Sequence, residues 1–386
     1  MKQLCIVTTM WSSINNWINP FLNDLHENGI HITIVCNMDS EYEKELKEQF
    51  PFVDTYPIAF PRGISFGGSL NSILKLKRFL KCKQFDMIQY STPNASFYAS
   101  IASKMTKVPV RLYCQWGMVY VTMHGIRKYI FKRIEKLVCK NSTIIQPDSI
   151  GNLEFCRREG LYDESKSGVI WNGSAKGIDL SVFDASIKVE YNRIIRERYD
   201  IPLDAPVIGF VGRLGREKGC HELFKAFREI QNTLPNAKLL FVGPIEKEET
   251  IDPELLDYFK NCDDIIKTDR VSNVEQYMSA MNVFVLPSYR EGFGMSVVEA
   301  AAMKVPVIVT KYPGPAGAMI DGINGYAIDI GDVEAITKKS LHLLQHPDLC
   351  EEMGTKGLEY VQANYDQQEF RKKYIDNRLM LIGKYT

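Results

Sequence analysis

The chain has 386 residues, of which 45% are hydrophobic and 24% are charged, and its formal net charge is zero. This length exceeds the roughly 250–300 residues at which a single core stops growing, so we expect two globular domains, and the composition excludes a disordered chain. No run of about 18 apolar residues is available to span a membrane, and nine scattered cysteines without a C-x-x-C pair argue against a disulfide framework or a zinc site and favour reduced thiols in a cytoplasm.

The first half of the chain predicts a parallel sheet with crossover helices, because short β-branched runs alternate with stretches of helical spacing. The expected strands are Leu4–Thr9, His31–Cys36, Asp86–Ser91, Val110–Gln115, Ser142–Pro147 and Ser167–Asn172. One helix between them is clearly marked, with Asn19 as N-cap, Pro20 at the first helical position and Gly29 at its end.

The strongest charge bias of the chain lies between Arg62 and Lys140, with about 15 Lys or Arg residues against two acids. Two expected helices, Ser69–Lys83 and Gly125–Lys140, carry most of these cations, and the apolar residues among them must mostly face the core. The basic faces could simply be solvated. We favour a polyanionic partner, and a membrane surface with its lipid over nucleic acid, because no nucleic-acid-binding module accompanies the charge.

A second series of expected strands begins after a charged, helical connector at Asp184–Tyr199. We therefore expect a first domain over residues 1–187 and a second over residues 188–366, with residues 367–386 packing back on the first. The strands of the second series are Pro206–Gly212, Lys238–Gly243, Ile265–Arg270, Val283–Ser288, Pro306–Lys311 and Gly325–Asp329.

Two strand-to-helix turns of the second domain carry the residues most suited to chemistry. The first, Gly212–Gly219, combines glycines with Arg213 and Lys218. Ligands of open parallel sheets bind beyond the carboxyl ends of strands, so this turn suits a diphosphate, which Arg213 can bind with two hydrogen bonds and Lys218 with a point charge. The alternative is a solvated basic loop.

The second turn, Arg290–Ala301, holds Glu291 and Glu299 with seven residues between them. Two glycines flank the turn, Ser296 begins an Ala-rich helix, and Glu299 lies one turn inside it. The N–H groups at the start of this helix could face a second side of the phosphates, and Glu299 could accept hydrogen bonds from two ribose hydroxyls. Glu299 could also be a first-turn acid that favours the helix dipole, and Glu291 an ordinary loop acid.

Together these turns resemble the retaining GT-B glycosyltransferases of glycosyltransferase family 4. The segment Asn172–Asp179 is similar to the interdomain stretch of the members that build capsule and lipopolysaccharide. The resemblance covers nearly the whole chain, and the E-x7-E pattern is its most specific part. It implies an α/β protein of two Rossmann-like domains, each with a mainly parallel sheet, that face each other across a cleft. The first domain would bind the acceptor and the second the nucleotide sugar.

The resemblance also implies roles for single residues. Arg213 and Lys218 would hold the donor diphosphate and stabilise the leaving group, Glu299 would take the ribose hydroxyls, and Glu291 would contact the transferred sugar. The expected donor-binding residues are Gly212, Arg213, Lys218, Gly243, Arg270, Glu291, Gly292, Phe293, Gly294, Met295, Ser296 and Glu299.

Family members retain the anomeric configuration and need neither a divalent metal nor a cofactor, and no D-x-D triplet occurs in this chain. Two cations and helix N-termini can neutralise a departing diphosphate in place of a metal ion. By resemblance the donor is a UDP-hexose or UDP-N-acetylhexosamine. The acceptor is expected to be a polyprenyl-diphosphate-linked saccharide, in capsule, lipopolysaccharide or exopolysaccharide biosynthesis, with the enzyme peripherally bound at the inner face of the cell membrane.

The chain departs from the family pattern at one position. Many members have a His where this chain has Trp116, which puts any mechanism that needs that His in doubt. His124 could assist catalysis instead, although a lone His is more often structural. Two other functions stay open: a GT-B sugar-nucleotide epimerase, and an inactive GT-B subunit that docks partners at a membrane.

Overall fold

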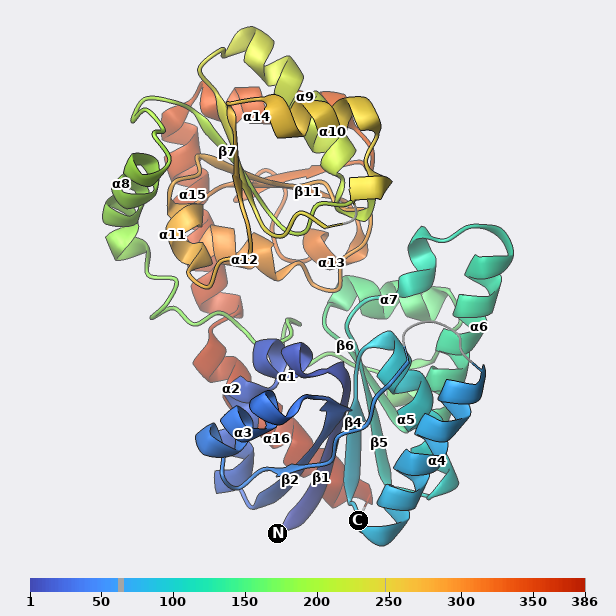
Figure 1. Ribbon diagram of the computed structural model, residues 1–386. Coiled ribbons are helices and arrows are strands. Elements are labelled where there is room, and N and C mark those ends of the chain that lie inside the picture. The colour runs from blue at the N-terminus through green and yellow to red at the C-terminus, as the bar shows by residue number, and fades with distance from the viewer. Residues whose placement is uncertain (62–65, 247, 386) are drawn as a thin grey trace. The chain divides into compact units, whose positions relative to one another are not determined.

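The structure is a computed structural model that describes residues 1–61, 66–246 and 248–385. The chain forms two compact units (Figure 1). Unit 1 comprises residues 1–177 and the chain from Gln368 onward, and unit 2 comprises Ile178–Gln367. The boundary falls before residue 178 and not at the expected 187 and 188. The reason is that Ile178 belongs to unit 2, where its N–H donates to the Tyr365 carbonyl at 2.7 Å and its carbonyl accepts from the Gln367 N–H at 2.9 Å.

Unit 1 has a six-stranded parallel sheet in the order β3-β2-β1-β4-β5-β6. The strands are β1 (Lys2–Met10), β2 (Ile30–Asn37), β3 (Asp54–Thr55), β4 (Met87–Tyr90), β5 (Val110–Gln115) and β6 (Ile144–Pro147). The helices are α1 (Trp11–Trp17), α2 (Asn19–Glu27), α3 (Ser40–Gln49), α4 (Phe66–Cys82), α5 (Pro93–Met105), α6 (Gly125–Asn141), α7 (Ile150–Arg158) and α16 (Gln367–Tyr385), with 3-10 turns η1 (Val119–Thr122) and η2 (Glu164–Lys166).

Three details of unit 1 differ from the sequence-based expectations. The short strand β3 was not expected, and the expected strand at Ser167–Asn172 contributes only a single bridge between Ser167 and Ile145. Helix α2 begins at Asn19, so Ile18 is its N-cap. The Asn19 side chain donates to Asn15 instead of capping the helix, because the preceding helix α1 brings that acceptor within reach.

Unit 2 has a second six-stranded parallel sheet, in the order β12-β11-β10-β7-β8-β9. All six expected strands are present: β7 (Val207–Val211), β8 (Lys238–Val242), β9 (Ile265–Thr268), β10 (Val283–Leu286), β11 (Val307–Thr310) and β12 (Gly325–Ile328). The helices are α8 (Lys188–Arg198), α9 (Cys220–Thr233), α10 (Pro253–Asn261), α11 (Val274–Ser279), α12 (Met295–Ala302), α13 (Pro313–Ala316), α14 (Val333–Leu344) and α15 (Pro347–Asn364), with 3-10 turns η3 (Ala185–Ile187), η4 (Arg216–Lys218) and η5 (Glu248–Thr250).

Helix α16, the last of the chain, packs on unit 1 (Figure 1). Tyr374 stacks on Phe21 of α2 with ring centroids 4.0 Å apart. Arg371 makes two hydrogen bonds of 2.6 Å to Asp24. Arg378 is only 1% exposed and donates to the side-chain oxygen of Gln89 in β4. The helix is therefore part of the core of unit 1.

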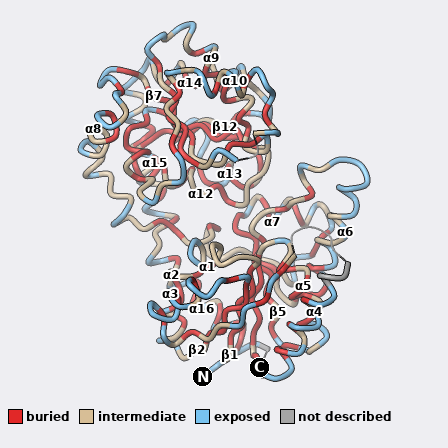
Figure 2. Tube along the Cα trace, in the orientation of Figure 1, coloured by how far each residue is buried: buried red, intermediate tan, exposed pale blue. Residues whose placement is uncertain are grey.

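Both sheets reverse their strand order at one point. In unit 1 the order turns between β1 and β4, and in unit 2 between β7 and β10. The strands are mostly buried, as Figure 2 shows in red. In doubly wound sheets, ligands bind beyond the carboxyl ends of the two strands at this reversal. In unit 2 a ligand is therefore expected to bind at the turns that follow β7 and β10.

Candidate functional site

The turns after β7 and β8 approach each other closely at the carboxyl edge of the unit 2 sheet. The Gly212 N–H donates to the Val242 carbonyl at 2.9 Å. Gly243 has a φ of +142°, and a Cβ atom on it would lie 2.2 Å from the Gly212 carbonyl oxygen. Only glycine fits there. Main chain without side chains at the carboxyl ends of strands lets a phosphate approach the backbone.

Lys218 and Glu291 form an ion pair at the reversal point. The Lys218 Nζ lies 2.6 Å from Glu291 Oε1, and the two side chains are 19% and 13% exposed. Ser288, just beyond β10, donates to the same carboxylate oxygen at 2.7 Å. Gly219 has a φ of +73°, and a Cβ there would lie 2.1 Å from the Pro287 carbonyl oxygen. The turn after β7 thus packs closely against the turn after β10. The predicted site residues Lys218 and Glu291 lie together as a result.

Arg213 follows β7 and is held more loosely. Its guanidinium lies 3.5 Å from the Glu217 carboxylate and 3.9 Å from that of Glu246, and its side chain is 37% exposed. Long contacts between partly exposed charges contribute little to stability because solvent screens them. The guanidinium can therefore exchange these carboxylates for an anionic ligand at a small free-energy cost.

Helix α12 begins at the same edge. Gly294 is its N-cap, with a φ of +86°, and a Cβ on Gly314 of α13 would lie 2.1 Å from the Gly292 carbonyl oxygen. Met295, Ser296 and Glu299 are half-buried. The N-terminus of α12, with its partial positive charge, thus follows Glu291 by four residues at this edge of the sheet, where it can face an anion.

Two residues of the predicted donor site lie elsewhere than the prediction implies. The Phe293 side chain is 2% exposed and packs edge-on against Tyr365 at 5.1 Å, so it belongs to the core and only its main chain can face a ligand. Arg270 is exposed beyond β9, the edge strand of the sheet. Among the contacts of the described residues, none joins Arg270 to the Lys218–Glu291 pair.

The predicted residues of the first domain belong to unit 1. His124 is exposed and precedes α6, where its side chain makes no capping hydrogen bond. Trp116 is half-buried, with its ring centroid 6.0 Å from that of Trp17. Both tryptophans border a small cavity that Arg378 also lines. Among the described residues, no side-chain hydrogen bond or ion pair of His124 supports a catalytic role.

Three polar residues of the site escaped the sequence-based prediction: Ser288, Glu217 and Glu246. Ser288 could have been found from its place as the first polar residue after β10, where side chains of a parallel sheet face ligands. Glu217 lies four residues after Arg213, so their pairing could have been suspected from the spacing, whereas no spacing in the sequence indicates the pair of Arg213 with Glu246.

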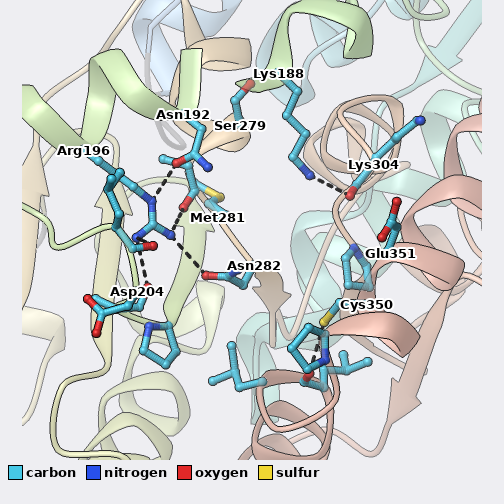
Figure 3. Close-up of a pocket in the computed structure, with 18 residues that line it drawn as sticks. Lys188, Asn192, Arg196, Asp204, Ser279, Met281, Asn282, Lys304, Cys350 and Glu351 are labelled. Carbon is cyan, nitrogen blue, oxygen red and sulfur yellow. Dashed lines mark hydrogen bonds between the residues drawn. The ribbon is translucent and has the colours of Figure 1, made fainter. Parts of the chain in front are cut away.

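A cavity of about 420 Å³ lies at the opposite, amino edge of the same sheet (Figure 3). Arg196 is 3% exposed and donates to Asn192, to the Pro202 carbonyl and to Asn282, so its hydrogen bonds tie α8 to the sheet. Lys188 donates to the Lys304 carbonyl at 2.8 Å. Burial lowers the pKa of Lys188 to about 8. These cations hold the helix in place, and we do not assign them to the candidate site.

Two further properties concern metals and membranes. Within the described ranges, no cluster of three or more His, Cys, Asp or Glu residues is arranged to hold a metal ion. Across those same residues, none of the helices combines the length and the apolar character needed to cross a bilayer.

The sequence of this chain is similar to sequences of known glycosyltransferases. Residues 192–360 match the family model "Glycosyl transferases group 1" and residues 4–149 match "Glycosyl transferase 4-like". The capsular polysaccharide biosynthesis glycosyltransferase CapM of Staphylococcus aureus is 31% identical over 339 residues, which is 86% of this chain and 87% of CapM. An Escherichia coli enzyme, UDP-Gal:alpha-D-GlcNAc-diphosphoundecaprenol alpha-1,3-galactosyltransferase, is 24% identical over 71% of this chain and 70% of its own.

Solved structures resemble the whole chain. A glycosyltransferase of Rickettsia africae superposes with a TM-score of 0.78 at 18% identity and covers 99% of this chain and 98% of its own. The Anabaena HepE protein in complex with UDP-glucose superposes with a TM-score of 0.78 at 14% identity and covers 98% of this chain and 100% of its own. At such identities the likeness concerns the fold.

Proposed function

This chain belongs to the group 1 glycosyltransferases and has the GT-B fold, and from this premise we propose the reaction it catalyses. It transfers a sugar from a UDP-sugar to a lipid-linked saccharide in the biosynthesis of a bacterial surface polysaccharide. The anomeric configuration is retained and no metal ion takes part. CapM supports the pathway class by its name, the E. coli relative supports a diphosphate-linked lipid acceptor, and the HepE complex supports a UDP donor.

The single observation that carries this proposal is the Lys218–Glu291 pair at 2.6 Å between the turns after β7 and β10. A mostly buried lysine at the reversal point of the sheet, beside the Gly212 turn and the N-terminus of α12, suits the binding of a diphosphate. Arg213 adds a second cation. Because its contacts with Glu217 and Glu246 are long, its guanidinium can reorient toward the phosphates.

In the reaction we propose, the bond between the anomeric carbon and the diphosphate oxygen breaks while the acceptor hydroxyl oxygen bonds to the same face of that carbon and passes its proton to the departing diphosphate. Negative charge grows on the leaving diphosphate, and Lys218 and Arg213 stabilise it more strongly than they stabilise the bound donor, which lowers the barrier. Glu299 accepts hydrogen bonds from the ribose. Glu291 contacts the transferred sugar, and Ser288 keeps its carboxylate in position while Lys218 binds phosphate.

Unit 1, in our proposal, collects the acceptor at the inner face of the membrane. Helix α6 carries exposed apolar residues, among them Ile126 at 71% and Tyr129 at 57% exposure, and exposed cations at Arg127, Lys128 and Lys136; its exposed stretch appears pale blue in Figure 2. Apolar side chains beside cations suit the interface of an anionic bilayer. Lys132 is already paired with Glu159 at 2.6 Å, and Arg62 lies outside the described residues.

The proposal is tested by incubating the protein with a panel of nucleotide sugars and an undecaprenyl-diphosphate-linked saccharide. We expect one UDP-sugar to yield a longer lipid-linked saccharide with the anomeric configuration of the donor. Isomerised donor without acceptor would indicate an epimerase instead. Absence of both product and nucleotide-sugar binding would indicate an inactive subunit.

A further inference from the structure

Unit 1 contains an apolar pocket of about 90 Å³ between α5, η1 and α6. Its walls include Phe97, Tyr98, Val119, Phe131, Ile134 and Val138. Helix α5 follows β4 and η1 follows β5, so the pocket lies at the carboxyl edge of the unit 1 sheet, where doubly wound sheets bind their ligands. Neither the family assignment nor the donor site gives this pocket a role.

The pocket offers few hydrogen bonds to a sugar or a nucleotide. Besides the tyrosine hydroxyls, its polar lining residues are Asn94 and Glu135. Asn94 donates to the Pro61 carbonyl at 2.8 Å. One oxygen of Glu135 accepts from the Tyr113 hydroxyl at 2.9 Å and from the Gln115 amide. Since the Asn94 amide nitrogen and this Glu135 oxygen are already engaged and the other walls are mostly apolar, the pocket suits hydrocarbon.

The size of the pocket limits what enters it. Its volume is about three times the ~30 Å³ that a water molecule occupies in the liquid, so it holds a short stretch of chain. Helix α6 forms one wall through Phe131, Ile134 and Val138, and its exposed cations Arg127 and Lys128 lie four and three residues before Phe131, on the same side of the helix. A hydrocarbon chain attached to an anionic headgroup therefore matches both the pocket and the cations one helical turn from its wall.

We propose that this pocket binds the first part of the hydrocarbon chain of an anionic, lipid-linked acceptor. The inference rests on the proposed function and adds to it the site on unit 1 that recognises the lipid. The pocket differs from the outer face of α6, where Ile126 and Ile130 are 71% and 41% exposed and would contact the bilayer. The enzyme would thus distinguish an acceptor that carries a hydrocarbon chain from one that carries none, without a larger membrane contact.

Two substitutions on α6 distinguish the role of the pocket from that of the outer face of the helix. Ile134→Trp fills the pocket, whereas Ile130→Trp places the same side chain one helical turn earlier, on the exposed face. Each buried methylene contributes about fourfold in affinity. We therefore expect Ile134→Trp to raise the KM for an undecaprenyl-diphosphate-linked saccharide by roughly 10- to 60-fold. Transfer to an acceptor whose diphosphate carries only a methyl group should stay unchanged, which also shows that the variant folds, and Ile130→Trp should leave the ratio of the two KM values as it is in the wild type.

A binding measurement tests the pocket independently of sugar transfer. Calorimetry should show that the wild type binds geranylgeranyl diphosphate more tightly than inorganic pyrophosphate, and that Ile134→Trp removes the difference. Equal binding of the two ligands by the wild type, or an unchanged difference in Ile134→Trp, would overturn the pocket assignment. Preferential binding of geranylgeranyl diphosphate by a protein that transfers no sugar would leave the pocket standing and overturn the proposed function.

Discussion

Lys218 and Glu291 are 73 positions apart in the sequence, and their side chains meet at 2.6 Å where the unit 2 sheet reverses its strand order. Both side chains are mostly buried, so the pair is not an ordinary surface contact. A lysine held in this way is already directed toward the edge of the sheet before any ligand arrives, which reduces the reorganisation that a reaction requires.

Replacing Lys218 by Ala removes a charge-assisted contact to the leaving diphosphate. Losing about 2–3 kcal/mol of transition-state stabilisation should lower kcat roughly 30- to 150-fold. Initial-rate kinetics measure the effect. Lys225→Ala, which removes an exposed lysine from α9, is the control and should keep full activity. Full activity in Lys218→Ala would show that this lysine does not act on the donor.

Replacing Glu299 by Ala should weaken donor binding, because two ribose hydroxyls lose their acceptor. Hydrogen bonds to a charged group contribute about 1.5–3 kcal/mol, so we expect at least a tenfold loss of UDP affinity by calorimetry. The affinity of Glu299→Ala for uridine, which has the ribose without phosphates, should fall by the same factor. Arg213→Ala, in contrast, should weaken UDP and leave uridine unaffected. Unchanged UDP binding in Glu299→Ala contradicts the assigned role.

Transfer should survive excess EDTA, since Lys218 and Arg213 neutralise the diphosphate in the proposed mechanism. The assay compares initial rates with EDTA, with added Mg²⁺ and with added Mn²⁺, all at the same ionic strength. If EDTA abolished transfer and only a divalent ion restored it, the role given to the two cations would be wrong.

Removing cations from α6 should release the protein from anionic membranes. Each Lys or Arg near an anionic surface contributes about 1 kcal/mol, so changing Lys128, Lys132, Arg133 and Lys136 to Ser should abolish co-sedimentation with anionic vesicles while UDP binding persists. Binding of the wild type should weaken in high salt because the Debye length shortens.

The control for this variant removes four other partly or fully exposed lysines, Lys44, Lys47, Lys338 and Lys356. It lowers the net charge equally and should leave vesicle binding intact. Equal binding of the wild type to neutral and anionic vesicles would show that the cations of α6 are merely solvated.

The stability of the protein should depend on pH through Lys188. Burial lowers the pKa of Lys188 from 10.5 to about 8, so between these values the unfolded chain binds more protons and the free energy of unfolding rises with pH. Relative to Lys188→Met, the wild type should gain about 1 kcal/mol between pH 7 and pH 9.

Urea unfolding of both proteins at each pH measures this difference. The comparison must be between variants, because burial raises the pKa of the neighbouring Cys350 to about 11, which lowers stability above pH 9 in both proteins. Lys304 and Glu351 also line the cavity around Lys188. Parallel plots of the free energy of unfolding against pH for the wild type and Lys188→Met would show that Lys188 is not buried as a charge.

The strands of unit 2 could be predicted from sequence because most are short apolar runs bounded by turn residues, and the four central strands, β11, β10, β7 and β8, are largely buried on both faces. Strand β3 could not, since its two residues, Asp54 and Thr55, carry no alternating pattern. The β-branched run at Ser167–Asn172 looked like a strand, but within the described part of the chain its β-pairing is the single bridge at Ser167. Whether a run pairs depends on tertiary contacts that local sequence does not encode.

The same limit applies to the site. The rule that ligands bind at strand ends was enough to bring Lys218 and Glu291 together. It could not show that Phe293 turns into the core, because its neighbour Tyr365 comes from the distant end of α15. It also could not show that Arg270 follows an edge strand, since the order of strands in a sheet is not visible in their order along the chain.

The place of α16 has a consequence for how the protein is made. Unit 1 contains the first 177 residues, yet its core includes Phe370 and Tyr374 of the last helix. During synthesis the chain emerges from its N-terminus, so unit 1 must wait, with part of its apolar surface uncovered, until the ribosome has finished unit 2. Unit 2 is continuous in sequence and can fold before release. A stop codon immediately before α16 would therefore damage the half of the protein that was translated first.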